Sequence, residues 1–195
     1  MPEAGRNRKS GSGEETDRQV LAEAHARALE RVRILEKVLH LFSAPQRLEQ
    51  NLLAVLDMAM EAIPAEAGSI LLLDESEENL LFAAARGPVA GEIKGLTVPV
   101  GEGLVGACMQ DKRSFPVSDV SREPRFSRKI SEQLGFPTQS ILAVPIVFRG
   151  AACGAIEVIN RKGSSTFLAH EVNLVEKLAQ ACGALVSMGV HLAAH

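Results

Sequence analysis

A glycine-rich stretch in the middle of the chain restricts its fold more than any other feature of the sequence. Gly101, Gly103 and Gly106 have the G-x-G-x-x-G spacing found in dinucleotide-binding proteins. In those proteins the motif follows a long buried strand and opens a full helix. Here Pro99 interrupts the preceding apolar run, and proline is rare in central strands. Because the helical run that starts at Leu104 is also short, the sequence argues against a dinucleotide fold.

Hydrophobic periodicity divides the rest of the chain into helices and strands. Residues 1–16 are polar and rich in glycine and serine, which predicts a disordered tail. Apolar residues with heptad spacing predict helices over residues 17–45 and 168–192, and a further amphipathic helix is expected to end at Pro64. Two β-hairpins are predicted from the apolar runs at 69–74, 79–86, 140–148 and 151–160. The irregular region between them, 87–139, is longer than an ordinary connection and indicates a binding region.

Four segments, in this order, resemble the GAF domain family of small-molecule sensor modules. They are AEAGSILLLDE at 65–75, VPVGEGLVGACMQDKRSFPVSDVSREPRF at 98–126, SILAVPIVFRGAACGAIEVINR at 140–161, and Phe167 with Glu171 at the start of the last helix. The resemblance covers about residues 46–190. It implies an α+β fold of the GAF and PAS type, with a central antiparallel sheet of about six strands, helices packed on one face, and long N- and C-terminal helices. We therefore expect a tail at 1–16, a coiled-coil-like helix at 17–45 and a GAF domain at 46–192.

Histidine placement argues against catalysis. All five histidines lie outside residues 41–169, so the predicted pocket lacks the commonest general base and metal ligand. We expect neither a metal nor a haem held by a pocket histidine. Bilin-binding relatives have a histidine beside the attachment cysteine, whereas Cys108 is followed by Met109. The sequence therefore predicts a protein that is not an enzyme.

The free-methionine sulfoxide reductases, a catalytic branch of the GAF family, are an alternative. Those enzymes carry a cysteine where this chain has Val105 and another in the stretch equivalent to 130–140, which contains none here. The three cysteines present, Cys108, Cys153 and Cys182, are far apart and indicate neither a disulfide framework nor a zinc site.

Polar residues after the glycine motif are the candidate ligand contacts. Arginine guanidinium groups suit carboxylates and phosphates, and in the family this segment covers the pocket. The predicted ligand-binding residues are Ser118, Asp119, Arg122, Arg125, Phe126 and Ser140. Asp119 could instead cap a helix that starts near Arg122, and the basic cluster could be a solvated surface. Glu157 alternates with Ile156 and Val158 and should face the other side of the sheet.

Cyclic-nucleotide-binding members of the family carry an Asn-Lys-Phe-Asp-Glu pattern. The corresponding positions here are Asn160, Arg161, Phe167, Glu171 and Val172. Two residues match, two keep the charge and the last acid is lost, so binding of cAMP or cGMP is left open and no cofactor is certain. The resemblance implies that Arg161 and Glu171 form an ion pair that closes the pocket.

The terminal helices have more apolar surface than one sheet requires, which predicts a homodimer. First and last helices commonly pack in a parallel dimer in the family. The predicted interface residues are Val32, Leu35, Leu39, Phe42, Leu178, Cys182 and Leu185. The alternative is that the N-terminal helix folds back on its own domain.

The chain is thus predicted to be a bacterial-type sensory or regulatory module of signal transduction. It would bind a small ligand and signal through the helical dimer to a separate, unidentified signalling protein. The alternative is a ligand-free dimeric scaffold whose pocket is filled by Leu104, Met109, Phe115 and Phe136. A net charge of −3 gives no reason to expect nucleic acid as a partner. Since no apolar run is long enough for a bilayer and the N-terminus lacks a secretory signal, a cytoplasmic protein with no membrane partner is expected.

Overall fold

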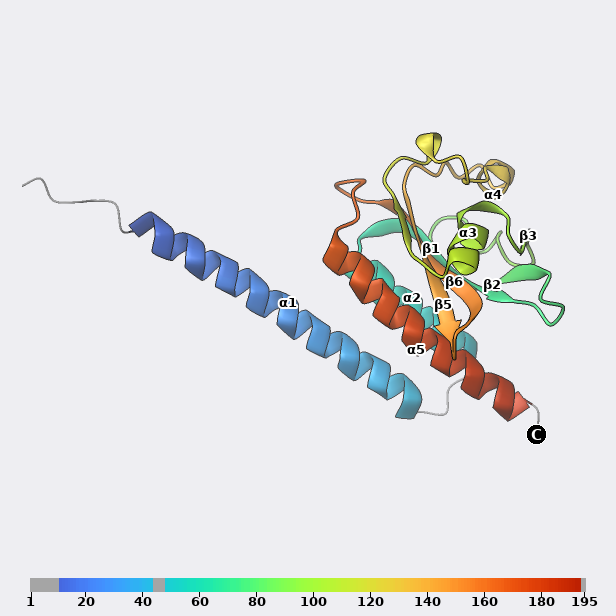
Figure 1. The fold of residues 1–195 in the computed structure, drawn as a ribbon, viewed down its shortest axis with the longest axis horizontal. Helices are drawn as coiled ribbons and strands as arrows, with labels where there is room; N and C mark the ends of the chain where they lie inside the picture. The colour runs from blue at the N-terminus through green and yellow to red at the C-terminus, as the bar shows by residue number, and fades with distance from the viewer. Residues whose placement is uncertain (1–10, 44–47, 194–195) are drawn as a thin grey trace, which may run out of the picture. The chain divides into compact units, whose positions relative to one another are not determined.

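The computed structural model describes residues 11–43 and 48–193 and divides the chain into two compact units, Met1–His40 and Leu41–His195 (Figure 1). Helix α1 spans Gly11–Ser43. It begins before the expected start at residue 17, because extending an established helix requires less free energy than nucleating one. Six large apolar side chains of α1 are between 50% and 73% exposed: Val20, Leu21, Leu29, Val32, Leu35 and Leu39.

The second unit is built on a six-stranded antiparallel sheet in the order β3-β2-β1-β6-β5-β4. Its strands are β1 (Ala65–Leu73), β2 (Asn79–Arg86), β3 (Thr97–Pro99), β4 (Phe115–Val117), β5 (Ile141–Phe148) and β6 (Ala151–Arg161). Both predicted hairpins are present as β1–β2 and β5–β6, and they join through the pairing of β1 with β6. The predicted α+β fold is confirmed.

Local residue chemistry explains two features of this sheet. Arg149 and Gly150, which join β5 to β6, both have positive φ angles, of 49° and 85°, as a type I′ hairpin turn requires. Pro99 lies in β3 at the edge of the sheet, where it faces Asn79. An edge strand tolerates a proline because one of its sides has no neighbour that needs the missing N–H group.

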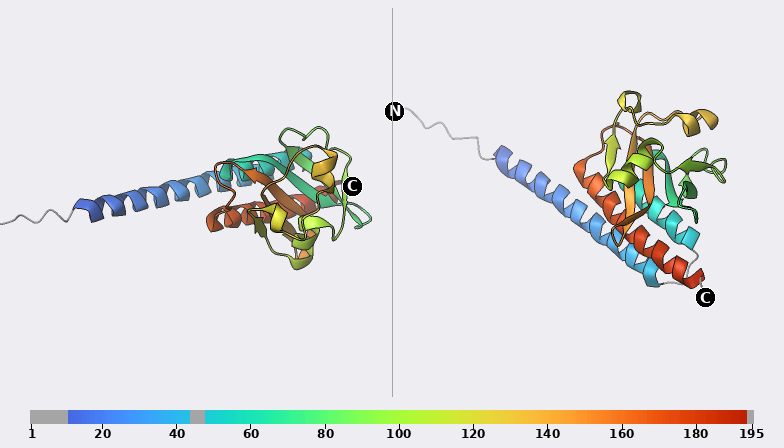
Figure 2. Two further views of the ribbon diagram at one scale, coloured as in Figure 1. Left: turned by 90° about the horizontal axis from the view of Figure 1, so that it is seen from above. Right: turned by 45° about the vertical axis from the view of Figure 1, so that its right-hand side comes forward.

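Two long helices, α2 (Leu48–Ala62) and α5 (Ala169–Ala193), lie side by side against one face of the sheet (Figures 1 and 2). Gly183 allows α5 to approach β5 closely, since a Cβ atom there would lie 3.0 Å from the Val147 carbonyl oxygen.

The α5 residues that were expected at a dimer interface lie in the core of their own domain. Leu178, Cys182 and Leu185 are 1%, 0% and 4% exposed. Because these side chains are already covered within their own chain, they offer almost no surface for contact with a second chain. Phe42, also expected at the interface, is outside the residues whose side chains are described.

The opposite face of the sheet is covered by the segment that the sequence left irregular. It contains α3 (Gly103–Asp111), a 3-10 turn η1 (Val120–Arg122) and α4 (Lys129–Gln133). Leu104, Val105 and Cys108 of α3 are buried in an apolar cluster with residues of β1 and β5. Of the helices in the described part of the chain, none combines the length and the apolar character needed to cross a bilayer.

Candidate functional site

A cavity of about 340 Å³ lies on the face of the sheet that carries α3 and α4. Its walls come from β1, β2, β3, β6 and the start of β5, from residues 89–93, from the start of α3, and from residues 126–138. Apolar side chains predominate among the lining residues, which include Leu71, Phe82, Val98, Leu104, Phe126, Ile130, Leu134, Phe136, Ile141 and Ile159. Small-molecule sites have volumes of about 300 to 1,000 Å³ and are mostly apolar with a few polar groups.

The glycine motif packs α3 against the turn that precedes it. A Cβ atom at Gly106 would lie 2.3 Å from the carbonyl carbon of Gly101 and 2.6 Å from its Cα. Gly101 and Gly103 have positive φ angles of 87° and 70°, which glycine adopts without strain. The motif therefore allows a tight turn and a close approach of α3. This role agrees with the sequence argument against a dinucleotide site.

Glu157 and Ser69 form the polar floor of the cavity. They face each other across β6 and β1, and the Ser69 hydroxyl donates a hydrogen bond of 2.7 Å to Glu157 Oε2. Ser69 is 2% exposed and Glu157 is 9% exposed. Burial raises the pKa of Glu157 to about 7, although the Ser69 hydrogen bond opposes the rise. A carboxyl with this pKa is present in both protonation states near neutral pH.

Glu157 was expected on the side of its strand opposite Ile156 and Val158 and was not among the predicted binding residues, yet it lines the cavity. Its neighbours Ile156 and Val158 are buried but do not line the cavity, as the alternation along β6 predicts. An acidic residue between apolar residues of a central strand was the available signal. Ser69, in the apolar run of β1, gave no comparable signal.

An ion pair lies at the edge of the cavity and joins the two segments that enclose it. Lys129 Nζ, at the start of α4, lies 2.8 Å from Oε1 of Glu102, the residue before α3. The Ser127 hydroxyl donates to the same Glu102 oxygen at 3.0 Å. The hydrogen bonds from Lys129 and Ser127 hold the pKa of Glu102 below its usual range.

Of the predicted ligand-binding residues, Phe126 lines the cavity and the other five do not. Asp119 caps η1, where its side chain accepts a hydrogen bond of 3.0 Å from the Ser121 N–H. Arg122 lies 3.3 Å from Asp119, and its side chain is 88% exposed. Ser118 is exposed as well. The geometry therefore shows helix capping, which was the alternative interpretation of Asp119.

The remaining two predicted residues have partners within the fold. Arg125 is paired with Glu123 at 2.7 Å, and its guanidinium carbon lies 4.2 Å from the centre of the Phe115 ring. Ser140 is buried, and its hydroxyl accepts a hydrogen bond of 3.1 Å from the Arg161 N–H. A ligand-binding role for the six predicted residues stays a prediction.

Asn160 anchors the end of the cavity-covering segment to the sheet. Its Oδ1 accepts from the Gln139 N–H at 2.7 Å, and its Nδ2 donates to the Pro137 carbonyl at 2.8 Å and to Glu66 Oε2 at 2.7 Å. The residue is 7% exposed and has a φ angle of 55°, which asparagine tolerates better than most residues. Asn160 thus fixes the chain that leads from the cavity wall into β5.

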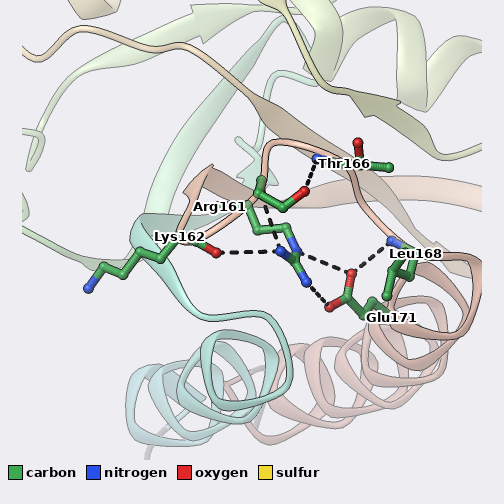
Figure 3. A network of polar contacts seen from close by, with 6 residues as sticks. Arg161, Lys162, Thr166, Leu168 and Glu171 are labelled. Atoms are coloured by element: carbon green, nitrogen blue, oxygen red, sulfur yellow. Dashed lines mark hydrogen bonds and ion pairs between the residues drawn. The ribbon is translucent and has the colours of Figure 1, made fainter.

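Arg161 and Glu171 form the ion pair that the resemblance implied (Figure 3). Arg161 donates two hydrogen bonds to the carboxylate, of 2.6 Å from Nη2 and 3.3 Å from Nε, and Glu171 also accepts from the Leu168 N–H at 2.8 Å. Burial raises the pKa of Glu171, but the hydrogen bonds from Arg161 and Leu168 outweigh it and hold the pKa below its usual range. The pair fastens the start of α5 to the end of β6. Neither residue lines the cavity, so a pocket-closing role remains a prediction.

The cysteine thiols are in apolar surroundings. Burial raises the pKa of Cys108, with Glu157 and Asp111 adding to the effect, and burial raises the pKa of Cys182 to about 12. Burial also raises the pKa of Cys153. Thiols of this kind are poor nucleophiles, because the thiolate is the reactive form. Within residues 11–43 and 48–193, no group of three or more His, Cys, Asp or Glu side chains has the arrangement of a metal site.

Solved structures resemble this fold closely. The GAF domain from a phosphoenolpyruvate-protein phosphotransferase of Coxiella burnetii has a TM-score of 0.75 at 24% identity, covering 86% of this chain and 99% of that one. A free methionine-R-sulfoxide reductase from Neisseria meningitidis, solved with its substrate, has a TM-score of 0.69 at 18% identity, covering 85% of this chain and 92% of that one. At these identities the likeness shows the fold alone.

Sequence comparison gives the family. A curated relative, the cGMP-specific 3',5'-cyclic phosphodiesterase of Drosophila melanogaster, is 28% identical over 114 residues, which are 57% of this chain and 10% of the relative. The chain therefore spans only about a tenth of the length of the curated relatives it matches. The GAF domain profile matches residues 47–186. With most of the chain covered by this match and the six-stranded sheet in place, the chain belongs to the GAF domain family.

Proposed function

We propose that this protein is a sensory module of signal transduction that binds a small ligand in the cavity and signals through a helical homodimer. The cavity itself is the observation that carries the proposal. It encloses about 340 Å³ and has a buried carboxyl and a hydroxyl on an otherwise apolar floor. A buried polar group without full hydrogen bonding is unfavourable for folding alone, which supports a binding role for it. GAF domains are commonly sensory or regulatory.

The volume of the cavity favours a sensor over a ligand-free scaffold. Four residues were expected to fill the pocket of such a scaffold. Leu104 and Phe136 line the cavity, whereas Met109 and Phe115 are packed in the apolar cluster beside it. The space that remains is within the range of small-molecule sites. A scaffold with a filled pocket would have a much smaller volume.

Cyclic nucleotides are the first ligands to test. The family match and the relatives named as cGMP-specific phosphodiesterases motivate this choice. Arg161 and Glu171 also form the ion pair expected from the partial sequence pattern. The relatives match this chain over a small part of their length, so their ligand is a starting point here.

The dimer would form through the exposed apolar side chains of α1. Val32, Leu35 and Leu39 are 50%, 59% and 65% exposed and follow heptad spacing. A ligand would order residues 101–135 and shift the terminal helices, and a separate signalling protein in the cytoplasm would read that change. Such coupling requires that the ligand bind two helix arrangements with different affinities.

Native mass spectrometry of gently purified protein, with and without cAMP and cGMP, tests the proposal. A dimer that retains a small adduct, or that saturates with one nucleotide, is the expected result. A dimer that carries no adduct and binds neither nucleotide would exclude tight cyclic-nucleotide binding and favour the ligand-free scaffold. A monomer would overturn the dimer mechanism.

The reductase alternative has less support. The likeness to free methionine-R-sulfoxide reductases is one of fold, at 18% identity for the Neisseria meningitidis enzyme. That chemistry needs reactive cysteines, and burial keeps Cys108 and Cys182 in the thiol form.

A further inference from the structure

We propose that the floor of the cavity recognises a positively charged nitrogen on a compact, otherwise apolar ligand, with the Glu157 carboxylate as acceptor. This inference rests on the proposed ligand-binding function and specifies the chemical class of the ligand. It depends on the hydrogen bonding of Glu157, on the pairing of the other charges around the cavity, and on the apolar walls.

Glu157 has an oxygen that is available to a ligand. Oε2 accepts the Ser69 hydrogen bond of 2.7 Å, and the described residues provide no further hydrogen bond to the carboxyl group. The residue lies on a central strand, between Ser69 of β1 and Ala143 of β5, and is only 9% exposed. Because this burial removes most contact with water, a donor in the cavity is the natural partner for Oε1.

The other charged side chains of the cavity wall are already paired. Arg86 makes two hydrogen bonds to Asp57, of 2.6 Å and 2.9 Å, and Lys129 is 2.8 Å from Glu102. Glu157 is therefore the one charged lining residue, among those the structure describes, that has no partner of opposite sign. An anionic group beside it would be repelled, so a cyclic nucleotide would have to place its phosphate away from Glu157, whereas a cation would gain a charge-assisted hydrogen bond.

Protonation and shape agree with a cationic ligand. Burial raises the pKa of Glu157 to about 7, and a bound cation would lower it again because opposite charge favours the carboxylate. Around the floor, Leu71, Phe82, Ile141 and Ile159 provide apolar contacts. At about 340 Å³ the cavity is near the lower limit for small-molecule sites, which favours a compact ligand.

Three probes of nearly equal size test the inference: phenethylamine, phenethyl alcohol and hydrocinnamate. Each is titrated into the full chain at neutral pH, and binding is followed by NMR shifts of the cavity methyl groups. We expect phenethylamine to bind at least about tenfold more tightly than the alcohol and the carboxylate, as one charge-assisted hydrogen bond allows. Glu157→Gln should remove this preference, while affinity for the alcohol changes little.

A matched control separates recognition from damage to the fold. Glu92→Gln removes an exposed acid that does not line the cavity and should change neither affinity nor preference. Thermal unfolding shows whether each variant is folded.

Each outcome decides the inference. Equal binding of the alcohol, stronger binding of the carboxylate, or an amine preference that survives Glu157→Gln would overturn it and leave the proposed sensor function standing. Failure of all three probes to bind would also overturn it. The native mass spectrum then decides the proposed function separately, since a retained adduct of any other chemistry still supports a sensor.

Discussion

The Ser69 hydroxyl on β1 donates a hydrogen bond of 2.7 Å to the Glu157 carboxyl on β6, its direct cross-strand neighbour. This bond favours the ionised form of a carboxyl whose pKa burial has raised to about 7. Ser69→Ala removes the donor and should raise the pKa of Glu157 by about one further unit. Carbon-13 NMR titration of labelled glutamate carboxyls measures the pKa. An unchanged or lower value in Ser69→Ala would contradict this account, and exposed Ser118→Ala is the matched control.

The pH dependence of stability should carry the signature of Glu157. Its folded pKa, about 7, is above the ordinary value of 4.5, so the folded state binds the proton more tightly than the unfolded chain. Its contribution is therefore fully present below about pH 4.5 and is lost as pH rises to about 7. At about 1.4 kcal/mol per pKa unit, the loss is roughly 3 kcal/mol. Glu157→Gln should abolish this loss and be relatively more stable at about pH 8 than at about pH 5, as measured by urea unfolding. Equal pH profiles for the two proteins would show that Glu157 titrates normally.

The buried ion pair of Arg161 and Glu171 should contribute more to stability than an exposed pair of similar geometry. The two side chains are 14% and 7% exposed, so Arg161→Ala leaves a buried carboxylate without its guanidinium group. We expect a loss of about 3 kcal/mol in the free energy of unfolding. Arg122→Ala is the control, because the Arg122 side chain is 88% exposed in its pair with Asp119 and should contribute under about 1 kcal/mol.

The same pair gives a pH effect of the opposite sign from that of Glu157. The pKa of Glu171 is held below its usual range, so its stabilising contribution is present above the unfolded value of about 4.5 and is lost as pH falls through the folded pKa. Arg161→Ala should remove most of this loss in acid. Acid unfolding curves that remain parallel for the two proteins would contradict the assignment.

Gly106 should be the least replaceable glycine of the glycine motif. Gly106→Ala places a methyl group 2.3 Å from the Gly101 carbonyl carbon, which forces α3 away from its preceding turn. Overpacking of this kind costs about 1 to 3 kcal/mol, and the displaced α3 should also weaken binding in the cavity. Gly91→Ala is the matched control, since a Cβ there meets no atom within 4 Å. Urea unfolding of both variants tests the comparison, and equal stabilities would count against the packing role.

The proposed dimer depends on the exposed stripe of α1. Leu35→Glu adds a charge at a side chain that is 59% exposed and should shift the protein from dimer to monomer, because an unpaired charge in an apolar seam is unfavourable. Ala26→Glu adds the same charge at an exposed residue off the stripe and should leave the dimer intact. Light scattering after size-exclusion chromatography measures the mass. A dimer that tolerates Leu35→Glu would exclude this seam.

The local elements and the family follow from the amino-acid sequence alone. Apolar runs predicted both hairpins, heptad stripes predicted the long helices, and the β2 strand was placed at 79–86 as observed. These features depend on residues near one another in the chain, and side-chain periodicity is set by the geometry of a strand or helix. The pairing of Arg161 with Glu171 was expected from a family pattern and is present in the structure.

Which side chains meet in the cavity depends on the three-dimensional packing of the chain. Ser69 and Glu157 are 88 residues apart in the chain and become neighbours because β1 pairs with β6. The arginines after Asp119 have the composition of an anion site, yet Arg122 and Arg125 are paired with nearby acids outside the cavity. A stripe on a helix shows that one face must be covered but does not show by what. For α5 the cover is its own sheet and α2, since strand order and helix packing, both long-range properties, decide which surfaces are buried.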